Sequence, residues 1–270
     1  ELTDNLWIKN IFGYRKQSVD RVQDYDGIPA TLIDPYQYKD LKNISDELQL
    51  QGTVMNGGLD FLVGAFSFEE KGIHGALSNT LPERVLVGFG QNPRTTPSDA
   101  YVTNRAGSGF SRSKAAFVAG TAHLTDQLSL SVGGRYTWDT REASILRQNY
   151  LGGGSPVFGG AGVAFGAPGT NFDGKRSFNK FTPRASLSFK PTPDHTLYAS
   201  YSQGFKGGGF DPRGVGVNAP DTDGNGTRSD DEIAAFLSFR PEQVESYEVG
   251  YKGSLMDLSL IHISEPTGPY

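Results

Sequence analysis

Apolar and polar side chains alternate along residues 125–138. Successive side chains of an extended strand point to opposite faces, so this alternation predicts a β-strand with one apolar and one polar face. The predicted apolar face carries Leu128, Leu130, Val132, Tyr136 and Trp138. The predicted polar face carries Gln127, Ser129, Ser131, Arg135 and Thr137. Such a strand fits a soluble sheet that packs on a second sheet, or an outer-membrane barrel that faces lipid and encloses an aqueous lumen.

The same pattern predicts about eight strands of about 9 to 12 residues each, a length that suits a tilted strand crossing a bilayer. They cover residues 5–16, 45–52, 59–70, 113–124, 128–138, 178–190, 196–206 and 244–255. Short turns are expected after Gly52, Leu124, Lys190 and Leu255. They alternate with long irregular connections, which are 18–43, about forty residues after Glu70, 141–176 and 207–241. Compact soluble domains rarely hold so many long connections. A barrel with short turns at one rim and long loops at the other accounts for them.

Composition narrows the class further. The 270-residue chain has no apolar run near the roughly 18 residues that a membrane-spanning helix needs, which excludes a helical membrane protein. Its net charge of −5 argues against nucleic-acid binding, and the absence of cysteine excludes disulfides and thiolate metal sites. The pattern and the 35 glycines together predict an all-β, antiparallel transmembrane β-barrel, here an incomplete run of strands with short periplasmic turns and long extracellular loops.

Six segments also resemble the barrel of TonB-dependent outer-membrane receptors. They are residues 45–52, 59–70, 128–137, 182–189, 197–210 and 241–252. The resemblance implies a barrel of about 22 strands in the bacterial outer membrane, filled by an N-terminal plug and driven by the TonB complex. Residues 1–257 are then expected to be part of the barrel domain, without the plug, the TonB-contacting region or the remaining strands.

The resemblance implies a receptor, with no enzymatic activity and no required cofactor, that takes up a scarce small-molecule ligand and contacts outer-membrane lipid. Iron-siderophore, cobalamin and carbohydrate ligands all stay open. The alternative is a small closed outer-membrane barrel for adhesion or passive diffusion. A barrel hydrolase would need a Ser, His and acid set that the strands do not assemble, and a soluble β-sandwich is the remaining choice.

Cations and aromatic residues on the predicted lumen face and rim are candidate ligand contacts. The five candidates are Arg135, Arg184, Phe205, Lys206 and Phe210. An anionic ligand would be attracted to the three cations. In the alternative interpretation, the cations pair with carboxylates of the plug or lumen, such as Asp139 and Glu248. The glycines around Phe205 and Phe210 are equally typical of a tight bend.

Residues 221–232 match the spacing of a Ca²⁺-binding loop. Acidic and amide side chains stand at loop positions 1, 3, 5 and 12, with glycine at position 6, where such a loop turns sharply. The predicted ligands of a structural Ca²⁺ are Asp221, Asp223, Asn225, the Thr227 carbonyl and Glu232. Arg228 stands where helix-paired versions carry an aliphatic residue, and no helix pattern precedes Asp221. A solvated acidic loop without an ion is the alternative.

The alternation fails after Leu260. Residues 258–267 resemble the translated adapter of a sequencing library, so we interpret 258–270 as a non-native tail. A genuine strand that is cut short is the alternative.

Overall fold

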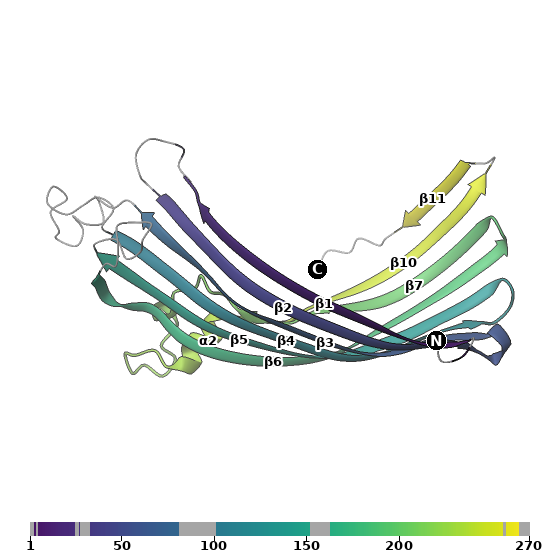
Figure 1. The fold of residues 1–270 in the computed structure, drawn as a ribbon, viewed down its shortest axis with the longest axis horizontal. Helices are drawn as coiled ribbons and strands as arrows, with labels where there is room; N and C mark the ends of the chain where they lie inside the picture. Colours follow the sequence, from purple (N-terminus) through teal and green to yellow (C-terminus); the bar gives the residue numbers. More distant parts are fainter. Residues whose placement is uncertain are drawn as a thin grey trace.

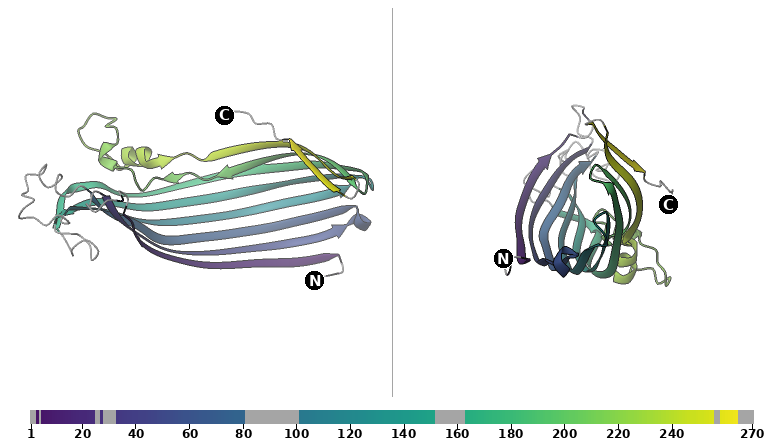
Figure 2. Two further views of the ribbon diagram at one scale, coloured as in Figure 1. Left: turned by 90° about the horizontal axis from the view of Figure 1, so that it is seen from above. Right: turned by 90° about the vertical axis from the view of Figure 1, so that its right-hand side faces the viewer.

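The computed structural model describes residues 3, 5–24, 27, 33–80, 101–151, 163–255 and 258–264. Nine of its strands form one antiparallel sheet that curves into an open trough (Figures 1 and 2). The nine strands are β1 (Leu6–Val22), β2 (Ile33–Val54), β3 (Leu59–Thr80), β4 (Tyr101–His123), β5 (Leu128–Leu151), β6 (Val163–Thr192), β7 (His195–Lys206), β10 (Glu242–Leu255) and β11 (Leu258–Ser264). The prediction of an all-β, antiparallel partial barrel is therefore confirmed.

Each strand pairs with the strand that follows it, in the order β1-β2-β3-β4-β5-β6-β7-β10-β11. The connection between β7 and β10 holds the short ribbon of β8 (Gly209–Phe210) and β9 (Ser238–Phe239), together with η2 (Gly216–Asn218) and α2 (Asp230–Leu237). The described part of the chain holds the helical segments η1 (Met55–Gly57), η2 and α2, and none of them is long and apolar enough to span a membrane. β11 belongs to the segment interpreted as a non-native tail, and that interpretation stays a prediction.

The strands are much longer than the alternation predicts. Strands β2 to β6 run for 22 to 30 residues. The prediction of irregular connections was wrong for the described parts of 18–43, 71–112 and 141–176, which are mostly paired strand. Beyond the alternating segments apolar side chains fall on both faces, as Ile145 and Leu146 do, so the ladder of backbone hydrogen bonds continues without an apolar period in the sequence. The short turns expected after Gly52, Leu124 and Lys190 are present, and the one after Leu255 falls on residues outside the described ones.

The register sorts the side chains onto two faces. The face that carries Leu130, Val132 and Tyr136 is called the belt face, and the face that carries Ser131, Arg135 and Thr137 is called the polar face. Directly paired residues of neighbouring strands share a face, so the apolar residues of successive strands lie side by side. They form a continuous belt of exposed apolar side chains across the belt face. The belt includes Ile8, Leu48, Val63, Val118, Val132, Tyr136, Trp138, Phe181, Leu187, Phe189, Leu197, Tyr247 and Val249.

The height of the belt matches a bilayer. Leu128 and Trp138 are ten residues apart in β5, which is about 34 Å along a strand. At the tilt of roughly 40° that is usual in such barrels, this length gives an apolar band about 25 Å tall. Strand β5 continues past Trp138 to Leu151, so the upper part of the sheet extends beyond the belt.

Several glycines in the sheet lie under aromatic rings of the neighbouring strand. A Cβ on Gly64 would lie 2.3 Å from Phe117 Cζ and 2.8 Å from the Leu48 carbonyl oxygen. Phe181 covers Gly134 in the same way, with its Cζ 2.5 Å from the position of a Cβ. The ring supplies the apolar contact that glycine lacks, which restores packing at an otherwise bare position of the sheet.

We predict that Gly64→Val lowers the free energy of unfolding of the protein by about 1–3 kcal/mol, because the new side chain must displace the Phe117 ring and crowd the Leu48 carbonyl. Urea titration of the purified protein in detergent measures this value. Gly109→Val is the control, since only the Glu142 carbonyl oxygen lies within 4 Å of its Cβ position, at 4.0 Å. Equal stability of the two variants would contradict the proposed packing role of Gly64.

Candidate functional site

Residues 207–241 connect β7 to β10 and fold over the polar face of β5 and β6; this connection is called the insertion. Leu237 of α2 is buried with Ile145 of β5 and Phe172 of β6. Ala143, Phe210, Ile233 and Ala234 pack around these three side chains. The sequence predicted an irregular loop here, whereas the insertion is folded and has its own small core.

Polar contacts hold the insertion in the same place. The Thr170 hydroxyl of β6 donates a hydrogen bond to the Gly214 carbonyl (3.0 Å) and accepts one from the Gly216 N–H (2.8 Å). A Cβ on Gly207 would lie 2.7 Å from an oxygen of the buried Asp139 carboxylate, so the chain passes very close to β5. The start and the middle of the insertion are therefore both fixed to the sheet.

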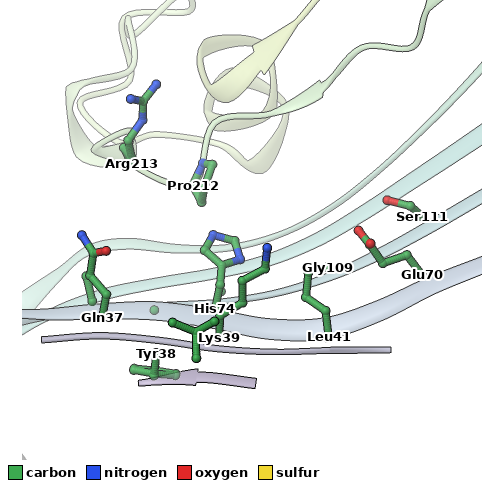
Figure 3. A pocket seen from close by; sticks show the side chains of 15 residues that line it. Gln37, Tyr38, Lys39, Leu41, Glu70, His74, Gly109, Ser111, Pro212 and Arg213 are labelled. Carbon is green, nitrogen blue, oxygen red and sulfur yellow. The ribbon is translucent and has the colours of Figure 1, made fainter. Parts of the chain in front are cut away.

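A cavity of about 590 Å³, called the rim cavity, lies between the insertion and strands β2 to β4. Figure 3 shows Pro212 and Arg213 of the insertion on one side, and Lys39 and His74 extending from the strands on the other. Its floor is almost bare backbone, formed by Gly72, Gly107, Gly109 and Ser111. Because no large side chain fills this part of the polar face, the space stays open to a small molecule.

A second hollow of about 330 Å³ shares His74, Gly107, Gly109, Ser111 and Pro212 with the rim cavity. It continues toward the base of the insertion. Its further lining includes Arg141, Ala143, Ile145, Lys206, Phe210 and Phe239. The two hollows together form one site beneath the segment 207–213.

Most cations around this site already have a carboxylate partner. Arg213 makes two contacts to Asp211, at 3.0 and 3.1 Å, and these hold the pKa of the Asp211 carboxyl below its usual range. Lys206 lies 3.5 Å from Glu242.

Arg141 likewise lies 3.5 Å from Asp139. Lys39 differs, because no carboxylate of the described residues lies within ion-pair distance of it. The rim cavity therefore presents one ammonium group without an ion-pair partner. It also presents the Glu70 carboxylate, which accepts a hydrogen bond from the Asn43 side chain (3.3 Å) and forms no ion pair within the described chain.

The structure places the predicted ligand residues in separate regions. Arg135 and Arg184 line a hollow of about 330 Å³ on the polar face at the height of the belt. The Arg135 guanidinium lies over the rings of Phe66 (4.9 Å) and Phe117 (5.6 Å), a cation–π arrangement. No carboxylate of the described chain forms an ion pair with either arginine.

The suggested pairing of these arginines with Asp139 and Glu248 is not what the structure shows. Asp139 lies beside Arg141, and Glu248 accepts a hydrogen bond from the Tyr198 hydroxyl. Residues 139 and 141 lie two apart in β5 and therefore share a face. Tyr198 of β7 is paired with Gly250 of β10, so it shares a face with Glu248, two residues from Gly250. Both carboxylates therefore contact near neighbours in the sheet instead of the two arginines. The Oδ1 atom of Asp139 is buried without a hydrogen-bond partner among the described residues.

The predicted rim residues separate as well. Lys206 and Phe210 line the site beneath the insertion, and Phe210 also packs edge-on against Phe172, with ring centroids 5.2 Å apart. Phe205 pairs with Gln243 on the belt face and lies outside that site. Lys39 and His74 were not among the predicted site residues, because both fall in stretches that were expected to be irregular. The glycines at the alternate positions 107 and 109 could have indicated a strand face without side chains, which forms the floor of the rim cavity.

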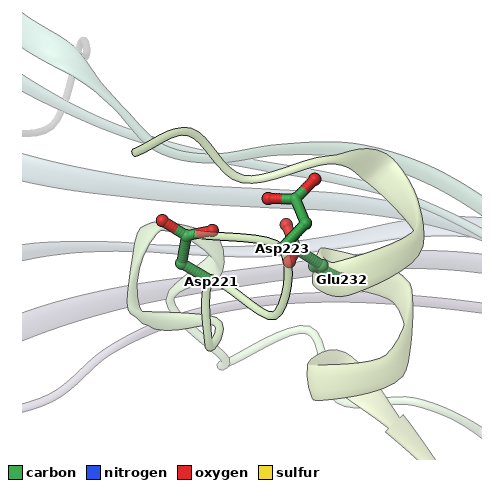
Figure 4. A group of neighbouring side chains, drawn as sticks. All are labelled: Asp221, Asp223 and Glu232. Carbon is green, nitrogen blue, oxygen red and sulfur yellow. The ribbon is translucent and has the colours of Figure 1, made fainter. Parts of the chain in front are cut away.

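The predicted Ca²⁺ loop brings three of its carboxylates together. Asp221, Asp223 and Glu232 each offer an oxygen within 4.8 Å of the others (Figure 4). Gly226 takes a positive φ of 81°, as the sharp bend requires. Its N–H donates to Asp221 (2.8 Å), and this bond holds the pKa of the Asp221 carboxyl below its usual value. The loop geometry thus fits an ion in part.

Glu232 has a structural role in the loop that the sequence analysis did not assign. Its carboxylate accepts hydrogen bonds from the Thr222 hydroxyl (2.6 Å) and the Ser229 N–H (2.9 Å), while the Ser229 hydroxyl accepts one from the Glu232 N–H (3.3 Å). Ser229 and Glu232 form a capping box at the start of α2. These bonds, led by that from the Thr222 side chain, lower the pKa of Glu232 from 4.5 to about 2.

Arg228 lies against two of the predicted Ca²⁺ ligands. Its guanidinium is 3.3 Å from the Asp221 carboxylate and 3.2 Å from the Thr227 carbonyl oxygen. The Asn225 side-chain oxygen accepts from the Thr227 N–H (2.8 Å). A positive charge of the chain itself therefore occupies part of the space where an ion would bind.

Comparisons with known proteins agree with this architecture. A family model described as TonB dependent receptor-like, beta-barrel, matches residues 1–263. No curated protein sequence matches the chain. Among solved structures, the ferric yersiniabactin uptake receptor FyuA from Yersinia pestis is similar at a TM-score of 0.65 and 17% identity, over 96% of this chain and 32% of that one. The closed form of the ferric-catecholate import receptor Fiu from E. coli K12 is similar at 0.52 and 16%, over 95% and 37%.

The chain thus spans about a third of the length of these two structures. At such identities the likeness shows the fold.

We predict that Ca²⁺ binds the loop 221–232 of the protein with a dissociation constant of about 10⁻⁴ to 10⁻³ M, the range of extracellular sites. Arg228→Ala is expected to bind several times more tightly, because the guanidinium no longer competes for Asp221 and Thr227. Asp223→Asn is expected to bind more weakly. Calorimetric titration measures all three proteins, and the absence of binding heat at millimolar Ca²⁺ in both the wild type and Arg228→Ala would contradict the prediction.

We also predict that the start of α2 opens in acid. A carboxyl whose pKa is lowered on folding stabilises the fold above its unfolded pKa, near 4.5, and loses that contribution as the pH falls toward 2. Hydrogen-exchange mass spectrometry of residues 219–238 should show protection falling from pH 5 to pH 3, beyond the intrinsic change in exchange rate. In Glu232→Gln this additional loss should disappear, and an equal loss in both proteins would exclude Glu232 as its origin.

Proposed function

Because the chain belongs to the TonB-dependent receptor family, we propose that it forms one section of the barrel wall of an outer-membrane receptor that takes up a scarce small-molecule ligand. The match of the family model over residues 1–263 is the observation that carries this proposal. Members of the family are transporters and not enzymes. In the complete protein, the TonB complex would drive uptake through a region N-terminal to this section.

The belt supports a location in the outer membrane. Its exposed apolar side chains face lipid in this proposal, and the polar face borders the lumen. The short turns between β2 and β3, β4 and β5, and β6 and β7 then lie in the periplasm. The opposite ends of these strands, together with the insertion, extend into the medium.

The rim cavity is the ligand contact of this section in our proposal. It lies on the polar face beyond the belt, where a ligand arriving from the medium would first meet the wall. Lys39 offers this cavity a cation and Glu70 a carboxylate, so the lining suits a polar ligand that contacts both. The names of FyuA and Fiu refer to ferric ligands of those two proteins, and on this likeness we favour a ferric chelate for this chain.

The alternative of a small closed barrel for adhesion or passive diffusion has less support. In the described sheet, β1 and β11 occupy opposite edges and are not paired with each other. The strands also extend well beyond the belt and carry a folded insertion, which supports a wall that holds a ligand site.

We predict that Gly109→Phe reduces ligand uptake at least tenfold, because the ring enters the open floor of the rim cavity without a steric conflict in the sheet. Cells that depend on the complete receptor would be supplied with radiolabelled ferric catecholate, ferric phenolate, cobalamin or maltodextrin. Ser144→Phe is the control, since its exposed side chain lies on the opposite face of the sheet and lines neither of the two hollows.

Uptake of one of these ligands by the wild type, and its loss in cells without TonB, would support the transport proposal. If the Gly109→Phe variant took up ligand at the wild-type rate, the rim cavity would not be part of the uptake pathway. Uptake that persists without TonB would overturn the proposed mechanism.

A further inference from the structure

Three lysines lie directly opposite one another on adjacent strands. Lys16 of β1 pairs with Lys42 of β2, and Lys42 pairs with Lys71 of β3. All three side chains are exposed. Because directly paired residues of an antiparallel sheet share a face, the three ammonium groups belong to one line across the sheet, called the lysine row.

The lysine row follows the edge of the belt on the belt face. Lys16 is two residues beyond Tyr14, and Lys42 is two residues from Ile44, so each lysine shares a face with an apolar neighbour. Tyr14 and Ile44 are 59% and 49% exposed. The row lies on the side of the belt where the strands lengthen toward the insertion. On β1 and β2 the row therefore lies next to exposed apolar side chains, and on β3 Lys71 lies between Glu69 and the 50%-exposed Ile73 on the same face.

Like charges placed directly opposite each other in a sheet are destabilising. Within the described part of the chain, no carboxylate forms an ion pair with Lys16, Lys42 or Lys71. Lys71 lies 5.2 Å from the centre of the Phe110 ring, a contact that attracts the ammonium but leaves its charge in place.

Nearby carboxylates have other partners. Glu69 binds Arg112 (2.8 Å), Glu142 binds Lys175 (2.8 Å), and Asp46 accepts a hydrogen bond from Asn10 (2.6 Å). Asp40, two residues beyond Lys42, is not within ion-pair distance of the row. The chain itself therefore leaves three adjacent positive charges unbalanced at the belt edge.

We propose that the lysine row binds the phosphate groups of lipids in the leaflet nearest the insertion. Phosphates of a bilayer lie at the boundary between the hydrocarbon layer and water, which is the level of the row if the belt faces lipid. Two steps between neighbouring strands separate Lys16 from Lys71 by about 10 Å. That spacing suits a headgroup that carries two phosphates, and lysine binds phosphate well as a point charge. The inference rests on the proposed membrane location of the belt.

The test compares the complete receptor with the triple variant Lys16→Gln, Lys42→Gln, Lys71→Gln. Vesicles of phosphatidylcholine, with or without bisphosphorylated lipid A, supply the probe. Each basic residue near an anionic lipid surface accounts for roughly a fivefold change in affinity, so lipid A should bind the triple variant about a hundredfold more weakly. The control is Lys9→Gln, Lys180→Gln, Lys252→Gln, which removes the same charge from the polar face and should keep wild-type affinity.

Thermal unfolding in the same vesicles provides a second readout. In phosphatidylcholine alone, the triple variant should unfold at a higher temperature than the wild type, because the repulsion between lysines is gone. With lipid A present, it should unfold at a lower temperature. If the lysines acted only through packing of their stems, the shift would have the same sign in both lipids.

Equal lipid A affinity of the wild type and the triple variant would overturn the proposal, and so would displacement of lipid A by millimolar inorganic phosphate. Ligand uptake by the same proteins separates this inference from the proposed function. Weaker lipid A binding by the triple variant, together with normal ligand uptake, would support lipid binding by the lysine row. Absence of TonB-dependent uptake by the wild type, with lipid A binding intact, would count against the transport proposal alone.

Discussion

Hydrogen bonding of the backbone between neighbouring strands is the constraint on which this structure depends. In a bilayer, water cannot satisfy the N–H and C=O groups of the chain, so each strand must bind its neighbours along its whole buried length. The strands of the sheet meet this requirement in chain order, from β1 to β7 and on to β10 and β11. Once the ladder fixes the direction of every side chain, one face is free to be apolar and the other to be polar.

The alternation in the sequence predicted strands only where one face of the sheet is apolar and the other polar. Only there must every second side chain be apolar, so only there does the sequence show a period of two. Leu128 to Trp138 is such a stretch. From Glu142 to Leu151 the ladder continues, yet the neighbouring apolar residues Ile145 and Leu146 lie on opposite faces, so no period of two marks the strand. Strand order and faces could therefore be predicted, and strand ends could not.

The candidate site was predictable only in part for the same reason. Arg135 and Arg184 alternate with apolar residues, so their face was evident from the sequence. Lys39 and His74 belong to the parts of β2 and β3 beyond the belt, where the pattern is lost. The spacing Ser229-x-x-Glu232 is a capping-box signal, but it overlaps position 12 of the predicted Ca²⁺ loop, and the helix was therefore missed.

The insertion is fastened to the sheet on one side only. Thr170, Ile145 and Phe172 hold it over β5 and β6, while Pro212 and Arg213 reach across toward β2 and β3 above the rim cavity. The close contacts of Gly207 and Gly214 with the sheet lie on either side of this segment in the chain, and the Arg147 side chain of β5 also donates a hydrogen bond to the Arg213 carbonyl (3.3 Å). The roof of the rim cavity is therefore held by β5 and β6, two strands that do not line its floor, so a substitution in them can change a ligand site that they do not contact.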